Sequence, residues 1–167
     1  MRDIKFRGVT PTGCWVKGSL IYHGEQPQIQ YVTRRHPDDG RVLGTDWAYV
    51  DPKTVGQHTG LLDKNGKAIY EGDIVCCEWE CLISSEDNIF PPEEEWKIEK
   101  FIGEVIWNQD DLQFEIKRTP GQIKLTPDNP MPLAYFSEAW KTDSGNESIT
   151  VIGNIHDNPE MLTAKTM

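Results

Sequence analysis

Apolar and polar residues alternate in short runs along most of the chain, which is the pattern of β-strands with one buried face. Eight runs either alternate or are short and apolar between turn residues. They are residues 2–8, 14–22, 28–32, 47–50, 74–81, 96–107, 112–116 and 149–155. Turn residues separate these runs, and the chain has 14 Gly and 11 Pro to supply them. We therefore predict a mainly β protein built from many short strands, in which the runs 2–8 and 14–22 form a hairpin. In the run 74–81 we expect Val75, Cys77, Trp79 and Cys81 to face the core and Ile74 to lie on the other face.

The strongest turn signal in the chain is the sequence Asp63-Lys64-Asn65-Gly66. Aspartate bonds to nearby backbone N–H groups, and Asn and Gly tolerate positive φ angles. A two-residue Asn-Gly loop would place Lys64 opposite Lys67, whereas a three-residue loop that ends at Gly66 pairs Asp63 with Lys67. We predict the three-residue loop, because it avoids the repulsion between two lysines.

Several segments lack a strand pattern. Residues 34–44 and 119–132 are rich in turn residues and are predicted as surface loops. Residues 82–97 include two consecutive prolines followed by three glutamates, so we predict an acidic excursion from the sheet. Residues 133–141 fit either a short strand or a helical turn.

The elements group into two small β subdomains. We expect residues 1–60 to form an N-terminal β subdomain, and residues 61–167 to form a barrel-like β subdomain that contains the acidic excursion. A short C-terminal helix is predicted to begin near Asn158, because an N-cap residue there precedes a proline at the first helical position. A chain of 167 residues is long enough to bury a core without a disulfide or metal staple.

The net charge of −10 comes from one part of the chain. Residues 76–115 carry 12 acidic and 2 basic residues, and the other segments nearly balance. Such a field repels nucleic-acid phosphates and favours basic partners. The N-terminus lacks a signal-peptide pattern, and no segment approaches the ~20 apolar residues needed to span a bilayer. We expect a cytoplasmic protein without a membrane partner.

Cys76, Cys77 and Cys81 are the residues that invite a metal interpretation. Neighbouring strand residues point to opposite faces, and the sequence has no C-x-x-C pair. We therefore expect buried thiols. Glycine-rich phosphate loops are also absent from the sequence, so neither a metal nor a cofactor is predicted.

Four residues have side chains suited to acid–base chemistry, namely Glu71, Asp73, His58 and His156. Glu71 and Asp73 flank a glycine and could project together, as a pair of catalytic carboxylates requires. Either histidine could supply a base. No nucleophile motif completes the set, and acids in such a bend more often bond to the backbone. We predict no enzymatic activity, with a hydrolase that uses these residues as the alternative.

Two groups of residues are candidates for binding a partner. The glutamates Glu93, Glu94 and Glu95 would attract a basic protein. Arg34 and Arg35, with nearby aromatic residues, would suit single-stranded nucleic acid, in which bases stack on rings and cations follow phosphates. The first 60 residues carry 8 basic and 6 acidic residues, an excess of only 2, so nucleic acid is the weaker hypothesis.

Four blocks of the sequence resemble the YopX family, whose members are encoded mainly by bacteriophages and prophages. The blocks are RDIKFR at 2–7, TGLLDKNG at 59–66, IYEGDIV at 69–75 and IGNIHDNPE at 152–160. The resemblance implies a mostly β, two-subdomain, phage-encoded cytoplasmic protein. It brings no established catalytic residues with it.

The expected function is therefore that of a phage accessory protein that binds another macromolecule or assembles with itself. The expected partner is a second copy of the chain or a host or phage protein. A hydrolase and a single-stranded nucleic-acid binder are the alternatives.

Overall fold

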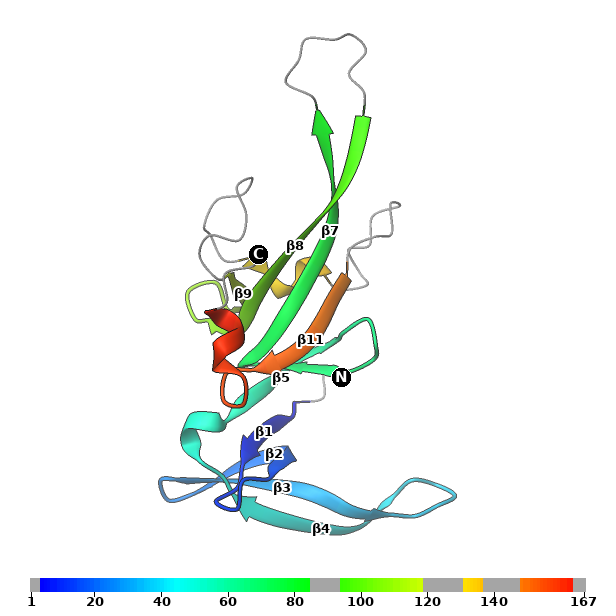
Figure 1. The fold of residues 1–167 in the computed structure, drawn as a ribbon. Helices are drawn as coiled ribbons and strands as arrows, with labels where there is room; N and C mark the ends of the chain where they lie inside the picture. Colours follow the sequence, from blue (N-terminus) through cyan, green and yellow to red (C-terminus); the bar gives the residue numbers. More distant parts are fainter. Residues whose placement is uncertain (1–3, 85–93, 119–130, 137–147, 164–167) are drawn as a thin grey trace. The chain divides into compact units, whose positions relative to one another are not determined.

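The computed structural model describes residues 4–84, 94–118, 131–136 and 148–163, which form two antiparallel β-sheets and a few short 3₁₀ helices (Figure 1). The first sheet contains β1 (Phe6–Val9), β2 (Trp15–His23), β3 (Gln26–Arg35), β4 (Val42–Tyr49), β5 (Gly56–Leu62) and β6 (Ala68–Tyr70). The second sheet contains β7 (Asp73–Ser84), β8 (Glu94–Asn108), β9 (Gln113–Arg118), β10 (Met131–Pro132) and β11 (Ser148–Asn154). The prediction of a mainly β protein with two β subdomains is confirmed.

The chain divides into two compact units. The first unit consists of residues 1–60 and 68–72 and holds the first sheet, in the order β4-β3-β2-β1-β5-β6, except for the last two residues of β5, Leu61 and Leu62. The second unit consists of residues 61–67 and 73–167 and holds the second sheet, in the order β10-β9-β8-β7-β11. Strand β6 thus belongs to the first unit, while the turn that precedes it belongs to the second.

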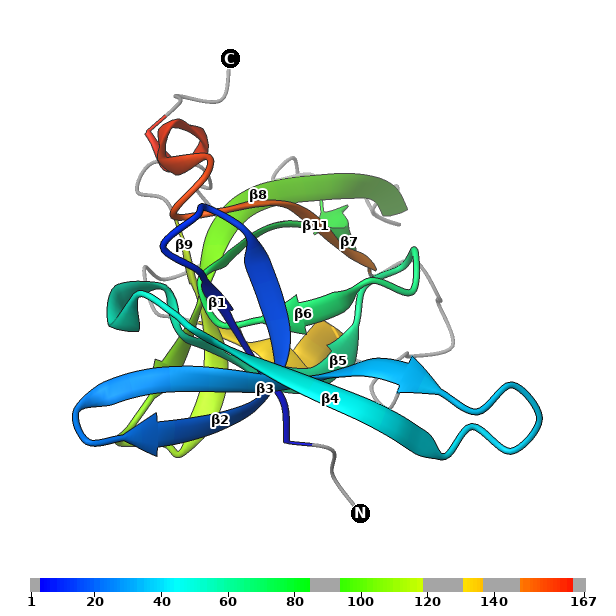
Figure 2. The same ribbon diagram turned by 90° about the horizontal axis from the view of Figure 1, so that it is seen from below.

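Strands β1 and β2 form the predicted hairpin, with Phe6 opposite Gly18. Beyond Gly18, β2 leaves β1 and pairs with β3, so this glycine marks the exchange of partner. Figure 2 shows β2, β3 and β4 side by side in the first sheet. The prediction of a loop throughout 34–44 is wrong, because the pairing of β3 with β4 extends to Arg35 and Val42.

The Asp63 turn has the predicted three-residue loop. Asp63 N donates to the Lys67 carbonyl at 2.8 Å, and Gly66 N donates to the Asp63 carbonyl at 2.9 Å. Gly66 has a φ of 78°, in the left-handed region that glycine adopts without strain. The Asp63 carboxylate accepts hydrogen bonds from the backbone N–H groups of Asn65, Lys67 and Val151. One side chain therefore closes the turn and ties it to β11.

The second sheet buries one face. The residues at the centre of this face are Val75, Cys77, Phe101, Val105, Phe114, Ile116, Ile149 and Val151. Val75 and Cys77 are predicted core positions, whereas Ile74, predicted to face solvent, is also fully buried. Strand β7 is therefore covered on both sides at its start. The side chains of the other two predicted core positions, Trp79 and Cys81, lie outside the described residues.

The second sheet is open in its described part, with β10 and β11 as its edges. Lys64 N donates to the Ile149 carbonyl at 3.0 Å, on the side of β11 that does not face β7. The Asp63 turn thus occupies the edge that closure would require. The expectation of a barrel-like second subdomain is therefore corrected to an open five-stranded sheet.

Two predictions about strand ends are also wrong. Strands β7 and β8 continue into the predicted acidic excursion up to the pair Ser84 and Glu94, and residues 85–93 lie outside the described residues. Leu112, predicted to begin an alternating strand, lies in the turn before β9 with a φ of 53° and an exposed fraction of 71%. The rest of β9 alternates as predicted.

The helical segments are short 3₁₀ turns. They are η1 (Pro52–Thr54), η2 (Leu133–Phe136) and η4 (Pro159–Leu162). Helix η2 supports the helical-turn alternative for the start of 133–141, and η4 is the expected C-terminal helix, although the Asn158 side chain forms no cap hydrogen bond. Most of the predicted loop 119–132 and the end of 133–141 lie outside the described residues. Within the described ranges, no helix has the length and apolar character needed to cross a membrane.

Candidate functional site

The two carboxylates weighed for catalysis lie in different units. Glu71 belongs to the first unit, where its backbone N–H donates to the Gln57 carbonyl at 2.9 Å and its carbonyl accepts from Arg7 Nη2 at 3.0 Å. Asp73 belongs to the second unit, where it is 1% exposed and lies opposite Asn154 between β7 and β11. Each residue is thus part of the strand framework of its own unit.

The two histidines also belong to separate units. His58 is half-buried in β5, and its ring centroid lies 5.1 Å from that of Tyr70. His156 is exposed after β11, and its backbone N–H donates to Asn154 Oδ1 at 2.9 Å. The structure places His58 against an aromatic ring and His156 in a turn closed by an asparagine side chain.

The cysteines form no metal-binding group in the part of the chain that the structure describes. Cys76 is half-buried and Cys77 is fully buried, and as neighbours in β7 they point to opposite faces. Burial raises the pKa of the Cys76 thiol, and the nearby charge of Glu78 raises it further. A thiol with a raised pKa carries little thiolate at neutral pH, so it is a weak nucleophile.

Glu78 is the centre of an ionic cluster in the second unit. Its Oε1 lies 2.6 Å from Lys100 Nζ, and its Oε2 accepts from Ser148 Oγ at 3.1 Å and lies 3.4 Å from Lys64 Nζ. The hydrogen bond from Lys100, followed by the one from Ser148, lowers the pKa of Glu78 to about 2. The ionised carboxylate therefore links β7 to its neighbours β8 and β11 at neutral pH.

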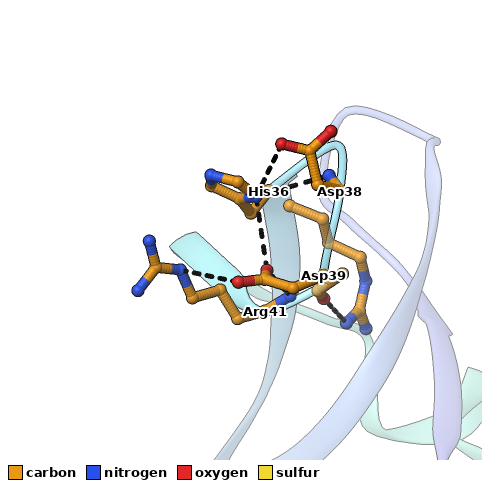
Figure 3. Close-up of polar contacts among 6 residues, drawn as sticks. His36, Asp38, Asp39 and Arg41 are labelled. Atoms are coloured by element: carbon orange, nitrogen blue, oxygen red, sulfur yellow. Dashed lines mark hydrogen bonds and ion pairs between the residues drawn. The ribbon is translucent and has the colours of Figure 1, made fainter.

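The loop between β3 and β4 is held by contacts among its own charged residues (Figure 3). Arg35 Nη1 donates to the Gly40 carbonyl at 2.9 Å. Asp39 Oδ1 lies 3.3 Å from His36 Nδ1, and Asp39 Oδ2 lies 3.4 Å from Arg41 Nε. Of the two arginines predicted to bind phosphates, Arg35 thus orders its own loop.

A second set of cations contacts aromatic rings of the first sheet. Arg7 is 7% exposed, and its guanidinium carbon lies 4.9 Å from the Trp15 ring centroid and 5.2 Å from that of Tyr70. Lys17 Nζ lies 5.2 Å from the Tyr70 centroid. These cation–π contacts join β1, β2 and β6. Arg34, the other predicted phosphate-binding residue, is exposed at the end of β3.

The side chains of the three consecutive glutamates, Glu93, Glu94 and Glu95, lie outside the described residues. The backbone of Glu93 lies outside them too, whereas Glu94 and Glu95 begin β8, opposite Ser84 and Ile83. That these glutamates attract a basic partner stays a prediction.

Part of one face of β2, β3 and β4 is exposed and consists of uncharged residues. Eight residues share it, and we call this surface the Trp47 face: Ser19, Ile21, Gln28, Gln30, Val32, Thr45, Trp47 and Tyr49. The exposed fractions are 53% for Trp47, 46% for Ile21, 40% for Val32 and 38% for Tyr49. The rings of Trp47 and Tyr49 meet edge to face with centroids 5.3 Å apart. An ordered aromatic pair is therefore presented to solvent.

The opposite face of the same strands is covered around Ile29. Ile29 is 0% exposed, and its cross-strand neighbours Leu20 and Ala48 are half-buried. Because successive strand residues alternate between faces, the Trp47 face points away from this covered side. The sequence pattern shows the alternation but not which face is covered, so the Trp47 face was not among the predicted sites.

A pocket of about 530 Å³ adjoins the Trp47 face at Tyr49. Its lining consists of Pro11, Glu25, Gln26, Pro27, Tyr49, Val50, Asp51 and Pro52. Asp51 also caps η1, because its Oδ1 accepts from Lys53 N at 2.9 Å. The pocket therefore combines an aromatic ring and three prolines with two carboxylates.

Fold and surface together define a two-unit β protein whose exposed aromatic face and adjoining pocket lie in the first unit. The chain belongs to the YopX protein family, because the sequence profile of that family matches residues 5–163. The resemblance seen in the sequence is thereby confirmed.

Among solved structures, the chain is similar to the crystal structure of protein EF1440 from Enterococcus faecalis. The two sequences are 19% identical, and the TM-score is 0.45. The alignment covers 97% of this chain and 99% of that one. A search of curated proteins found no match.

Proposed function

We propose that the chain is a non-enzymatic phage accessory protein that binds another protein through the Trp47 face. The observation that supports this proposal is the exposure of large apolar side chains among the eight uncharged residues of the Trp47 face. Trp47 is 53% exposed and Val32 is 40% exposed, although both side chains are apolar. Contiguous apolar surface of this kind marks interaction sites in soluble proteins. The phage origin follows from the family resemblance.

The composition of the Trp47 face fits the centre of a protein interface. Such centres are depleted in charged residues and enriched in aromatic residues. The apolar side chains are accompanied by two amides and two hydroxyls, and Gln30 Nε2 donates to Thr45 Oγ1 at 3.5 Å. Tryptophan and tyrosine supply a large share of the binding energy at interfaces. Trp47 and Tyr49 are therefore the expected anchors.

Replacing both Trp47 and Val32 with serine is expected to abolish capture of the partner. Loss of an interface tryptophan costs about 2 kcal/mol or more, which is roughly a 30-fold loss of affinity. The measurement is affinity capture from phage-infected host cells, identification of the captured protein by mass spectrometry, and titration calorimetry with that purified protein.

The matched control is Tyr22→Ser. Tyr22 is 61% exposed and lies on the opposite face of β2, so this variant removes an exposed aromatic ring without touching the Trp47 face. It should bind the captured protein as tightly as the intact chain does. Equal affinity of the Trp47/Val32 double variant and the Tyr22 variant would contradict the proposal.

A second candidate is self-association through β4, which is an edge strand of the first sheet. Val50 N donates to the Pro27 carbonyl at 3.1 Å. In an antiparallel pair every second residue bonds to the partner strand, so the backbone N–H and C=O groups of Trp47, three residues before Val50, point away from β3. Asp46 Oδ1 accepts from Trp47 N at 2.8 Å and so occupies one edge donor. Charged residues on an edge strand limit its pairing with other chains. Asp46 therefore restrains, but does not remove, this route to a dimer.

Replacing Asp46 with threonine is expected to strengthen self-association about tenfold, because it frees the edge donor and removes a repelling charge. Sedimentation velocity at protein concentrations on the order of tens of micromolar measures the monomer and dimer populations. Thr45→Ser serves as the control on the same strand. Purely monomeric behaviour of both the intact chain and the Asp46 variant would contradict this candidate.

A further inference from the structure

The pocket beside Tyr49 continues the Trp47 face. Tyr49 belongs to that face and also lines the pocket. Gln26 lines the pocket too, and it lies on the same side of β3 as Gln28, because the two residues are two positions apart. A protein that covers the Trp47 face therefore has the pocket within reach of its own side chains.

The two acidic residues of the pocket lie in a turn and at a helix cap. Glu25 lies in the two-residue turn between β2 and β3, in which Gly24 has a φ of 66° and His23 lies opposite Gln26. Asp51 is fixed by its cap of η1. None of the eight lining residues is basic. The pocket is therefore negatively charged with no internal counterion in its lining.

Apart from Gln26, the remaining walls are apolar. Pro11, Pro27 and Pro52 supply rigid aliphatic surface, and Tyr49, a residue that is 38% exposed, supplies an aromatic ring. An aromatic ring attracts a cation, and proline rings pack against a methylene stem. Arginine and lysine are the side chains that combine an aliphatic stem with a terminal cation. A volume of about 530 Å³ is within the usual range for a small-molecule pocket, so the pocket has room for such a side chain.

We infer that this pocket binds an arginine or lysine side chain of the protein that docks on the Trp47 face. The inference rests on the proposed docking function for the identity of the donor, but the pocket itself is testable alone. The charge of Glu25 and Asp51 selects the cation, and Tyr49 with the prolines selects the stem. The partner is therefore a protein with a basic residue at the border of an apolar patch.

The test is an NMR titration of ¹⁵N-labelled full-length protein with Nα-acetyl-arginine N-methylamide. Nα-acetyl-citrulline N-methylamide, which has nearly the same shape without the charge, is the matched control ligand. We expect saturable shifts of the amide signals of Gly24, Gln26 and Val50 with the arginine compound. The citrulline compound should bind about tenfold more weakly or leave these signals unchanged. Equal shifts with the two compounds would overturn the inference.

Glu25→Gln and Asp51→Asn test the two carboxylates. Both substitutions remove charge and keep the size of the side chain, and asparagine at position 51 retains an acceptor for the cap of η1. The double variant should weaken arginine binding about tenfold or more, and Glu25→Gln alone, in an exposed turn, should weaken it measurably. Unchanged arginine affinity in the double variant would overturn the inference.

The outcomes for the pocket and for the docking face can be told apart. The Trp47/Val32 double variant leaves both carboxylates and Tyr49 in place, so it should still bind the arginine compound. If it does, and if capture of the partner does not depend on Trp47, the docking proposal fails while the cation site stands. If capture depends on Trp47 but the arginine compound causes no shifts in the intact chain, the cation site fails while docking stands.

Discussion

Replacing Asp63 with alanine is expected to lower the free energy of unfolding of the second unit by about 3 kcal/mol, because three partly or fully buried backbone donors lose a charged acceptor. Asp63 Oδ1 accepts from Asn65 N at 2.8 Å and from Lys67 N at 2.9 Å, and Oδ2 accepts from Val151 N at 3.1 Å. The Asp63 residue is 6% exposed, so water cannot easily replace the lost carboxylate. Equilibrium urea unfolding followed by circular dichroism measures the change.

Asp63→Asn is the matched control for this prediction. Its amide oxygen can still accept from the two N–H groups of the turn, but its amide nitrogen would face Val151 N. The expected loss is therefore intermediate, about half that of alanine. An alanine variant as stable as the asparagine variant would contradict this account, because it would show that the two turn contacts, which only asparagine retains, contribute little.

The stability difference between the intact chain and Asp63→Asn should also depend on pH. Burial raises the pKa of Asp63, but the hydrogen bonds from Val151, Lys67 and Asn65 outweigh it, and the pKa lies below its usual value of 3.8. A lowered pKa in the folded state means that the stabilisation is complete above the unfolded pKa. It is lost as the pH falls through the lower folded pKa. The difference should therefore be constant near neutral pH and shrink under acid conditions.

Replacing Gly18 with alanine is expected to destabilise the first unit by about 3 kcal/mol, the upper end of the cost of overpacking. A Cβ atom at this position would lie 1.9 Å from the Gln30 carbonyl oxygen and 2.8 Å from the Gln30 carbonyl carbon. Both are backbone atoms of the adjacent strand, so no side-chain movement relieves the clash. The strands β2 and β3 must separate where β2 changes its partner, and urea unfolding measures the loss.

Ser19→Ala is the control for Gly18. Ser19 is the next residue of β2, lies opposite Gln30 and is exposed, so its replacement should change the free energy of unfolding by less than about 0.5 kcal/mol. The two variants therefore separate the effect of a new Cβ atom from that of a general change in β2. Equal stability of the two variants would contradict the steric account.

Local chemistry made part of this fold predictable from the sequence. The Asp63 turn could be predicted because the choice between two loop lengths depends on residues that are close in sequence, and repulsion between Lys64 and Lys67 decides it. The hairpin of β1 and β2 was predictable for the same reason, since alternation and a turn between the strands determine it.

Other features were not predictable from the alternation of apolar and polar residues. Ile74 alternates as a solvent-facing residue but is fully buried, because both faces of β7 are covered. Leu112 continues an apolar alternation but adopts a φ of 53° in a turn, an unusual conformation for leucine. At the β11 edge of the second sheet, Lys64 N donates to the carbonyl of Ile149, and these two residues are far apart in the chain.

The candidate site shows the same division. Sequence reasoning identified titratable residues by type, and the structure places Glu71 and Asp73 in different units. The Trp47 face escaped prediction because alternation gives two faces and only tertiary structure decides which is covered. Ile29 is fully buried on one face of these strands. Trp47 and Tyr49 lie on the other face and are exposed.

The most direct test of the docking function is site-specific photo-crosslinking in infected cells. A photoreactive phenylalanine analogue at Gln30, in the middle of the Trp47 face, is compared with the same analogue at Tyr22, on the opposite face. We expect one discrete cross-linked protein from position 30 and none from position 22. No cross-link from position 30, or the same cross-link from both positions, would contradict binding through the Trp47 face.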